Sequence, residues 1–393
     1  MKVRKFVVAA LALAAVAAAM TVGATTAAGK SSAGPTIVIG AAVDLTSSMK
    51  PFDSPALAGA RVEAAKLAKA GGPRFVFKVC NHQLKRQQAC AAQLIQQGAK
   101  IAFVTCDVEY AAPATQQFIN RGILTMSPCV TTDQMGPQRF GAKGKLAFTV
   151  GSAAQDEGSA EAEWAYSQGW RTAIVVKDNL LVYFREVSDA FAKRFEELGG
   201  KVVDRQAFTS FKKDIGPVIS KVAGEKADVI SFVTAFGELP QFVAGIRSAG
   251  NETPIVNSWG GDGTYWNPKS PQVTNYYNDN YGSSFGDDPN PAVNALLKSM
   301  LAAKQIPYTA SFVLGAATVD LLAAALKKSK GNASGAALAR IIERFKNQPT
   351  ISGPVTFTPT LHTVQGRPWR IMQVQNNKET YVRLWKTQKV AHL

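Results

Sequence analysis

Side chains able to bind or react follow two apolar segments between residues 100 and 132. Residues 101–105 and 123–126 have the β-branched, apolar character of buried strands, and 111–120 has the pattern of a short helix that tolerates Pro113 in its first turn. This order predicts two parallel strands joined by a right-handed helical crossover. The strands are followed by Cys106, Asp107, Val108, Glu109 and Tyr110, and by Ser127, Cys129, Thr131 and Thr132. Because ligands of open α/β sheets bind beyond the carboxyl ends of the strands, we predict half of a ligand site here.

One short segment matches a catalytic motif. Ser47-Ser48-Met49-Lys50 has the S-x-x-K spacing of penicillin-binding proteins and β-lactamases, in which the serine begins a helix and S-D-N and K-T-G follow. Here the match lies in a polar loop before Pro51, the sequence contains no S-D-N, and Lys386-Thr387-Gln388 lacks the glycine. The sequence also lacks G-x-S-x-G, H-E-x-x-H and P-loop motifs. We therefore predict a protein that is not an enzyme and needs no cofactor.

The first residues have the composition of a secretory signal peptide. A basic start precedes an apolar run over 6–22, and small residues follow. The run is rich in alanine and marginal for a membrane span, so a retained anchor is the alternative. We predict a signal peptide over 1–28, cleaved after Ala24 or Ala28, and export to the periplasm or the outside of the cell.

All four cysteines, Cys80, Cys90, Cys106 and Cys129, lie within one stretch of the exported chain. An even number in an oxidising compartment favours disulfides, and four cysteines allow three pairings. Metal binding is the alternative, but no histidine pair lies among them. We predict Cys80–Cys90, which closes a short loop, and Cys106–Cys129, which joins the ends of two neighbouring strands.

The same alternation of strand and helix recurs about seven times between residues 36 and 257. It predicts an α/β fold with mostly parallel sheets, divided into two blocks near Gly151. From 260 to 292 a segment rich in glycine, asparagine, aspartate and proline is predicted to be a long loop. Later helices are expected at 292–303, 310–328 and 335–345, and final strands at 354–357, 369–374 and 380–385.

The chain is basic. Its net charge is +16, and removal of Lys2, Arg4 and Lys5 with the signal peptide lowers it to +13. Such charge suits nucleic acids, anionic envelope polymers or an anionic ligand. The basic residues are scattered without a run of five or six, and export argues against nucleic acid. We interpret the charge mainly as a solvated basic surface, with an anionic ligand as the alternative.

Seven segments together resemble the branched-chain amino-acid binding proteins, the type I extracytoplasmic solute-binding proteins of ABC transporters. In chain order they are IVIGAAVDLTSS, a helix ending in AKAGG, VCNHQLKRQQACAAQLIQQGAKIAFVT, GILTMSP, VDRQAFTSFKKDIGPVISKV, ADVISFVTAFGELPQFVAGIRSAG and ISGPVTFTPTLHT. The resemblance runs from about residue 36 to the end and rests on their order and spacing. It implies two Rossmann-like lobes joined by three crossovers, with a ligand between them. We expect an N-terminal lobe of 36–151 with 283–354 and a C-terminal lobe of 152–282 with 355–393.

The resemblance also implies ligand-binding positions. They are aromatic side chains in both lobes, a backbone amide and a threonine hydroxyl after the SP element, and an acidic residue in the glycine-rich turn after residue 257. Where the family offers a serine, this chain has Glu109 and Tyr110, and the family's other carboxylate is absent or displaced to Asp156. The predicted ligand-binding residues are Phe52, Glu109, Tyr110, Cys129, Thr131, Tyr183, Phe236, Trp259 and Asp262.

Each of these residues also has a purely structural interpretation. Thr131 could cap a turn, Glu109 could favour a helix start through the helix dipole, and the aromatic side chains could pack in a core. Because half of the amino-acid-specific contacts are missing, the sequence predicts a solute that differs from a standard branched-chain amino acid.

We predict a monomeric binding protein that captures a small polar solute, such as an amino acid, an amide or a small carboxylate. It would deliver this solute to the permease and ATPase of an ABC importer, with no nucleic-acid partner and no metal. The alternative is a sensor that presents its closed form to a membrane receptor or kinase. Both functions need the same clamp, so the neighbouring genes would separate them.

Overall fold

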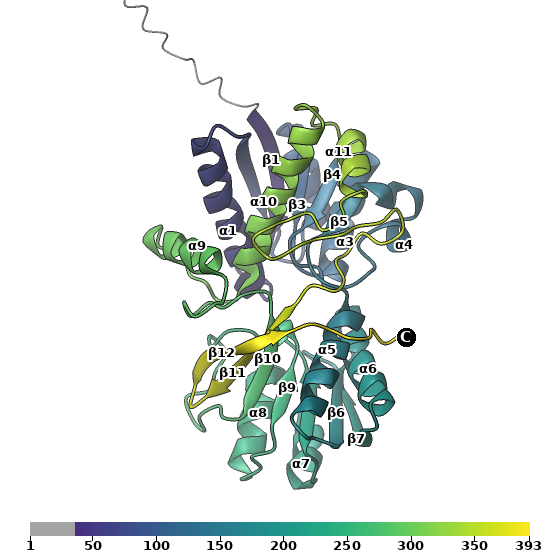
Figure 1. The fold of residues 1–393 in the computed structure, drawn as a ribbon, viewed down its shortest axis with the longest axis vertical. Coiled ribbons are helices and arrows are strands. Elements are labelled where there is room, and N and C mark those ends of the chain that lie inside the picture. The colour runs from purple at the N-terminus through teal and green to yellow at the C-terminus, as the bar shows by residue number, and fades with distance from the viewer. Residues whose placement is uncertain (1–35) are drawn as a thin grey trace, which may run out of the picture. The chain divides into compact units, whose positions relative to one another are not determined.

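Two sheets organise the chain in the computed structural model, which describes residues 36–393 (Figure 1). The predicted signal peptide lies outside the described residues. The first sheet has the order β2-β1-β3-β4-β5, and all its strands are parallel. Its strands are β1 (Thr36–Val43), β2 (Arg74–Asn81), β3 (Ile101–Val104), β4 (Leu124–Ser127) and β5 (Ala147–Thr149).

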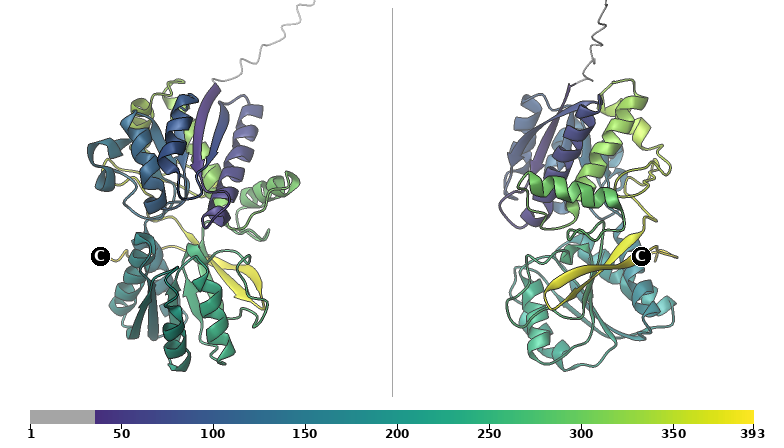
Figure 2. Two further views of the ribbon diagram at one scale, coloured as in Figure 1. Left: turned by 180° about the vertical axis from the view of Figure 1, so that it is seen from behind. Right: turned by 60° about the vertical axis from the view of Figure 1, so that its left-hand side comes forward.

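Helices flank this sheet, and we call the sheet with these helices the five-stranded half (Figure 2). The helices are α1 (Lys50–Lys69), α2 (Gln87–Gln96), α3 (Val108–Asn120), α4 (Pro137–Phe140), α9 (Pro291–Ala302), α10 (Ser311–Lys328) and α11 (Gly335–Ile342). A 3₁₀ helix, η1, spans Gly141–Leu146.

The second sheet has the order β12-β11-β10-β9-β8-β6-β7. Strands β7, β6, β8, β9 and β10 run parallel, and β11 and β12 add antiparallel pairs at one edge. These strands are β6 (Thr172–Asp178), β7 (Lys201–Phe208), β8 (Val229–Val233), β9 (Ile255–Asn257), β10 (Tyr276–Asn280), β11 (Trp369–Gln375) and β12 (Lys378–Trp385). With α5 (Ala154–Ser167), α6 (Val182–Glu197), α7 (Ile215–Gly224), α8 (Glu238–Ser248) and the 3₁₀ helix η2 (Trp259–Gly261), they form the seven-stranded half.

The chain passes between the two halves three times, after β5, after β10 and before β11. The first and third crossings pair through an isolated parallel bridge between Ser152 and Val364. The second crossing contributes Tyr281, whose hydroxyl accepts a hydrogen bond from the Ser152 backbone N–H at 3.0 Å. The three connections therefore lie side by side and contact one another.

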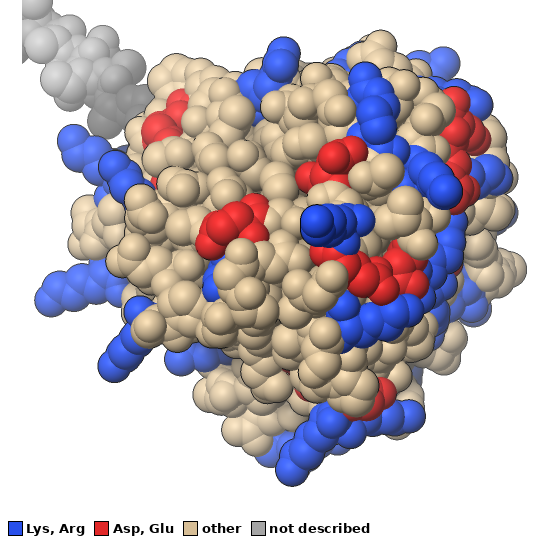
Figure 3. Space-filling view, turned by 90° about the horizontal axis from the view of Figure 1, so that it is seen from below, with Lys and Arg blue, Asp and Glu red and all other residues tan. Residues whose placement is uncertain are grey.

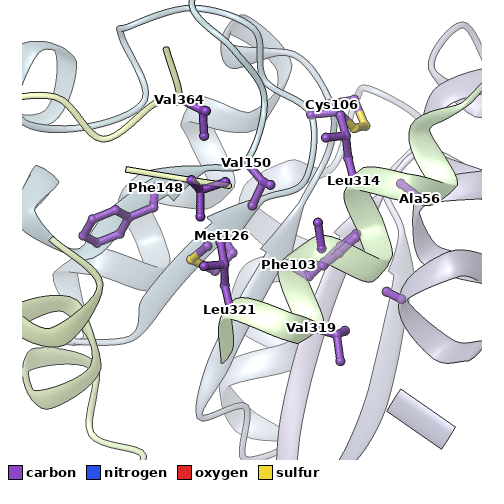
Figure 4. Packing of buried hydrophobic residues seen from close by; sticks show 14 of the residues in the cluster. Ala56, Phe103, Cys106, Met126, Phe148, Val150, Leu314, Val319, Leu321 and Val364 are labelled. Carbon is purple, nitrogen blue, oxygen red and sulfur yellow. A yellow bond between two sulfur atoms is a disulfide. The ribbon is translucent and has the colours of Figure 1, made fainter. Parts of the chain in front are cut away.

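Helix α10 carries much of the core of the five-stranded half. Its Leu314 and Leu321 belong to the same buried cluster as Phe103 and Met126 of the sheet (Figure 4). The helix also packs against α1 at glycine contacts, because a Cβ atom at Gly315 would lie 1.8 Å from the Ala56 carbonyl oxygen. Only glycine allows two helix backbones to approach so closely.

The predicted alternation of strand and helix is confirmed, with three local corrections. The apolar spacing of residues 56–70 predicts a helix over that range, but helix α1 already begins at Lys50, because Pro51 suits the first helical turn. Strand β10 lies inside the segment that was predicted to be a loop. The strand expected at 354–357 is wrong, because Val355 makes only an isolated bridge with Gln348.

The face shown in Figure 3 carries many lysine and arginine side chains, interspersed with smaller acidic groups. This distribution agrees with a solvated basic surface rather than a single binding patch. Among residues 36–393, no helix has both the length and the apolar character needed to cross a membrane.

Candidate ligand-binding cleft

A small cavity lies where the two halves face each other. Its volume is about 20 Å³, which is room for about one water molecule. The five-stranded half contributes Met49, Phe52, Cys106 and Asp107. The seven-stranded half contributes Leu181, Tyr183, Phe184, Ala235, Phe236, Trp259 and Gly260.

The lining residues follow the carboxyl ends of five parallel strands. They come after β1 and β3 in one half and after β6, β8 and β9 in the other. This is the edge at which open α/β sheets bind ligands. A larger hollow of about 780 Å³ lies between α1 and α9, but helix side chains rather than strand ends form most of its wall.

Buried carboxylates fix the loops on the five-stranded side. Asp53 accepts hydrogen bonds from the backbone N–H of Asp44 at 2.7 Å and of Cys106 at 2.9 Å, and so links the loops after β1 and β3. Burial raises the pKa of Asp53 to about 7. Asp44 in turn accepts from the backbone N–H of Ser47 and Met49, at 2.9 and 3.0 Å.

Both predicted disulfides are present, and one of them belongs to this wall. Cys106–Cys129 joins the ends of β3 and β4 with a Cα–Cα distance of 4.6 Å. Cys80–Cys90 joins the end of β2 to α2, with a Cα–Cα distance of 5.5 Å. Cys106 lines the cavity and Cys129 lies behind it, so the disulfide stiffens the wall from within.

Two acidic residues stand at the start of α3. Asp107 caps the helix by accepting from the Tyr110 backbone N–H at 3.2 Å. Burial, and then the charge of Glu109, raises the pKa of Asp107 well above its usual value. Glu109 reaches the other half, where its Oε1 accepts from the Val182 backbone N–H at 2.9 Å. Its Oε2 is buried without a hydrogen-bond partner.

Aromatic rings dominate the seven-stranded side. Phe52 and Trp259 meet across the cavity edge to face, with ring centroids 5.0 Å apart. Phe184 contacts Tyr183 at 5.5 Å and Phe236 at 5.8 Å between centroids. These rings offer a large apolar contact area with few rotatable bonds.

One carboxylate organises this aromatic wall. Glu157 Oε1 accepts from the Tyr183 hydroxyl at 2.8 Å and from the Trp259 backbone N–H at 2.7 Å. Glu157 is fully buried near the start of α5, and burial raises its pKa to about 7. The nearby hydrogen bonds oppose this shift but do not cancel it.

Glu157 belongs to a buried group of three carboxyls with Glu161 and Asp279, whose oxygens lie within 4.8 Å of one another. Among residues 36–393, the oxygens of Glu161 and Asp279 have no hydrogen-bond partner. Burial first, and then the neighbouring carboxylates, raises the pKa of both well above the usual value. Such oxygens suit a hard cation, and retained protons would also neutralise them.

The structure places the predicted residues in two groups. Phe52, Tyr183, Phe236 and Trp259 line the cavity. The second group lies outside this lining and consists of Glu109, Tyr110, Cys129, Thr131 and Asp262. A direct ligand contact of the second group stays a prediction.

Residues of the second group have structural partners. The Thr131 hydroxyl donates to the Cys129 carbonyl oxygen at 3.1 Å and lies 3.3 Å from the Tyr281 hydroxyl. Asp262 accepts from the Ala310 backbone N–H at 2.5 Å, at the start of α10. Tyr110 is half-buried, and burial raises the pKa of its hydroxyl to about 12.

Sequence reasoning missed Glu157 and chose its neighbour. The Asp156 carboxylate points to other partners and accepts hydrogen bonds from the Gly366 backbone N–H and the Trp369 indole N–H. The two adjacent acids at a helix start are a visible signal. Only the direction of each side chain separates them, and the helix register sets that direction.

Comparisons with known proteins agree with this geometry. The periplasmic binding protein family matches residues 36–379. The Leu/Ile/Val-binding protein homolog 3 of Brucella melitensis is 23% identical over 336 residues, which cover 84% of this chain and 89% of that protein.

Two solved structures share the fold. The branched-chain amino acid transporter substrate binding protein LivJ of Streptococcus pneumoniae, in complex with isoleucine, superposes with a TM-score of 0.76 at 18% identity. The match covers 89% of this chain and 99% of that chain. A solute binding protein of an ABC transporter from R. palustris, in complex with benzoate, gives a TM-score of 0.73 at 17% identity, covering 89% and 96%.

Proposed function

Because the chain belongs to the periplasmic binding protein family, and within it to the branched-chain amino-acid binding type, we propose that it captures a small polar solute between its two halves and delivers it to an ABC importer. The solute would be an amino acid, an amide or a small carboxylate. The partners would be a membrane permease and its ATPase, and the protein would act as an exported monomer without catalysis.

The cavity at the ends of five strands is the observation that carries this proposal. Its lining comes from both halves, so a solute bound there contacts both at once. Such a solute stabilises the closed arrangement relative to an open one. A cavity of about 20 Å³ admits no amino acid, so binding requires the halves to separate or the rings to move.

The contacts between the halves suit a reversible clamp. Glu109 joins the start of α3 to the start of α6 with a single hydrogen bond to Val182. Near the crossings, Tyr281 connects Thr131 and Ser152. A few polar contacts at the rim and a compact set of connections allow closure without rebuilding either core.

Within the cavity we assign the main solute contacts to Phe52, Tyr183, Phe236 and Trp259. Their rings form most of the apolar surface, and backbone groups beside Cys106 and Gly260 lie at the same edge. Burial of a solute in a mainly apolar cleft with few polar contacts is how small-molecule sites reach affinity and orientation.

Binding measurements on the mature chain, residues 29–393, test the proposal. Mass spectrometry of small molecules released from the purified protein identifies candidates, and calorimetry with a panel of amino acids, amides and carboxylates measures their affinity. At least one solute is expected to bind. If no compound binds and none is released, the proposed function is wrong.

Trp259→Ala tests the position of the site. Removal of a ring that lines the cavity is expected to weaken solute binding by about 10-fold or more. Trp170→Ala is the matched control, because Trp170 packs against Trp164 and Tyr277 outside the cavity. Equal affinity of both variants would exclude this cavity as the binding site.

A further inference from the structure

The lining of the cavity combines aromatic rings with negative charge. It contains Phe52, Tyr183, Phe184, Phe236 and Trp259 together with the acidic residue Asp107. No lysine, arginine or histidine belongs to this lining within residues 36–393. Resting on the proposed function, we propose that the solute carries a positively charged nitrogen, as an ammonium or quaternary ammonium group, which binds among these rings next to Asp107.

The aromatic rings of the lining are inclined to one another rather than stacked in parallel. The planes of Phe52 and Trp259 are inclined by 63°, and those of Phe184 and Phe236 by 73°. The face of an aromatic ring carries partial negative charge, so each ring face that a solute reaches would attract a cation. A neutral apolar solute would gain the same contact area but not this electrostatic attraction.

Some of the backbone N–H groups beside the cavity are already bonded to protein carboxylates. On the five-stranded side, Cys106 N–H donates to Asp53 at 2.9 Å and Tyr110 N–H to Asp107 at 3.2 Å. Strand-end and helix-start N–H groups are the usual anion sites of such folds. A solute carboxylate that used these two N–H groups would have to displace Asp53 and Asp107.

On the seven-stranded side, backbone N–H groups are likewise bonded to protein carboxylates. Val182 N–H, at the start of α6, donates to Glu109 at 2.9 Å, and Trp259 N–H donates to Glu157 at 2.7 Å. Four acidic side chains therefore surround the cavity, each on a backbone N–H, and no cationic side chain of the lining balances them. Burial raises the pKa of Asp53, Asp107 and Glu157, so a bound cation would stabilise the ionised form of these carboxyls, whereas a bound anion would oppose it.

This inference narrows the solute classes given above. Amines and quaternary ammonium compounds carry the proposed cationic nitrogen, whereas uncharged amides and small carboxylates do not. It also separates the cavity from the basic outer surface, because the positive net charge of the chain resides on side chains that do not line the site.

Two matched sets of probes test the inference. The first is choline, its uncharged isostere 3,3-dimethylbutan-1-ol, and 3,3-dimethylbutanoate. The second is 3-methylbutylamine, 3-methylbutan-1-ol and 3-methylbutanoate, with leucine as a zwitterion. Calorimetry and thermal melting at pH 7 are expected to show cations binding about 10-fold more tightly than the alcohols, with carboxylates weakest.

Tighter binding of an alcohol, a carboxylate or leucine than of the matched cation would overturn the inference and leave the proposed function intact. If no probe binds, the solute released from the purified protein decides. A cationic solute supports the inference, and an anionic or uncharged one overturns it. Absence of both binding and released solute overturns the proposed function itself.

Asp107→Asn tests the role of the charge. Asparagine keeps the helix cap on Tyr110 N–H but cannot ionise when a cation binds, so cation affinity is expected to fall about 10-fold while alcohol affinity falls less. Asp214→Asn is the control, because exposed Asp214 accepts from the Thr209 backbone N–H outside the cavity. Equal weakening of cation and alcohol in Asp107→Asn would show a change of shape rather than of charge, and would contradict the inference.

Discussion

The two walls of the cleft are stabilised by different kinds of interaction. The wall of the five-stranded half is cross-linked by Cys106–Cys129 and by Asp53, whose carboxylate holds two loops. The wall of the seven-stranded half has aromatic rings that pack on one another and on a single carboxylate, Glu157. Within residues 36–393, both disulfides belong to the first half.

This difference separates two tasks. A covalently joined wall keeps its shape whether or not a solute is present, and so offers a preorganised surface. A wall of packed rings makes additional contacts when a solute or the other half lies against it. Closure therefore stabilises this wall more than the cross-linked one. We expect the first wall to determine where the solute lies and the second to determine how tightly it is held.

Removal of the Cys106–Cys129 disulfide by alanine at both positions tests the first wall and should have the largest effect. The bond closes a span of 23 residues, so its loss is expected to lower the free energy of unfolding by about 3 kcal/mol. Solute affinity should fall as well, because Cys106 lines the cavity. Urea unfolding and calorimetry measure the two quantities.

Alanine at both Cys80 and Cys90 is the matched control. That bond spans 10 residues away from the cavity, so stability should fall by a similar amount while solute affinity is kept. Loss of affinity in both double variants would show that the disulfides act through general stability, and the contrast between the walls would disappear.

Glu157→Gln tests the second wall. Burial raises the pKa of Glu157 from 4.5 to about 7, so its contribution to stability is complete below pH 4.5 and is lost as the pH rises through 7. The variant cannot ionise and keeps an oxygen for Tyr183 and Trp259. It should match the wild type at pH 4.5 and exceed its free energy of unfolding at pH 8 by about 3 kcal/mol.

Glu163→Gln on the same helix gives the opposite expectation. Glu163 is ion-paired with Arg194 at 2.7 Å, and loss of its charge leaves that buried guanidinium with the longer pair to Glu197, at 3.3 Å. This variant should lose stability at pH 8. A destabilised Glu157→Gln at pH 8 would mean that Glu157 is needed in its charged form, contrary to our interpretation of the aromatic wall.

Glu109→Ala tests the contact that connects the walls and should have the smallest effect. The loss of one hydrogen bond to Val182 is expected to favour the open form by about 1 kcal/mol, which weakens solute binding about five-fold. Small-angle scattering of the free protein reports the change in compactness. Glu196→Ala, which removes a pair with Arg205 within one half, should change neither quantity.

Much of the fold follows from local patterns, and the exceptions have physical causes. Apolar runs such as Ile101–Val104 are buried on both faces of a parallel sheet and are therefore visible in the sequence. Strand β10 was missed because its buried residues Asn278, Asp279 and Asn280 are polar. Their burial depends on partners far along the chain, such as Glu379, which accepts from the Asn278 side chain.

The family resemblance indicated aromatic positions that the structure brings to the cleft. Aromatic residues after strand ends, such as Phe236 and Trp259, line the cavity, and their contact with a solute stays a prediction. Acidic residues were harder, because each one can cap a helix, bridge the halves or face the solute. Asp262 caps α10 and Glu157 supports the rings, and nothing in the local sequence distinguishes these two arrangements.

The small size of the cavity has a kinetic consequence. Because it has room for about one water molecule, we expect a solute to enter and leave only after the halves separate. Its dissociation rate constant then cannot exceed the rate at which the halves open. Solutes of different affinity share this upper limit, so the residence time of a weak solute is set by the protein and not by the solute.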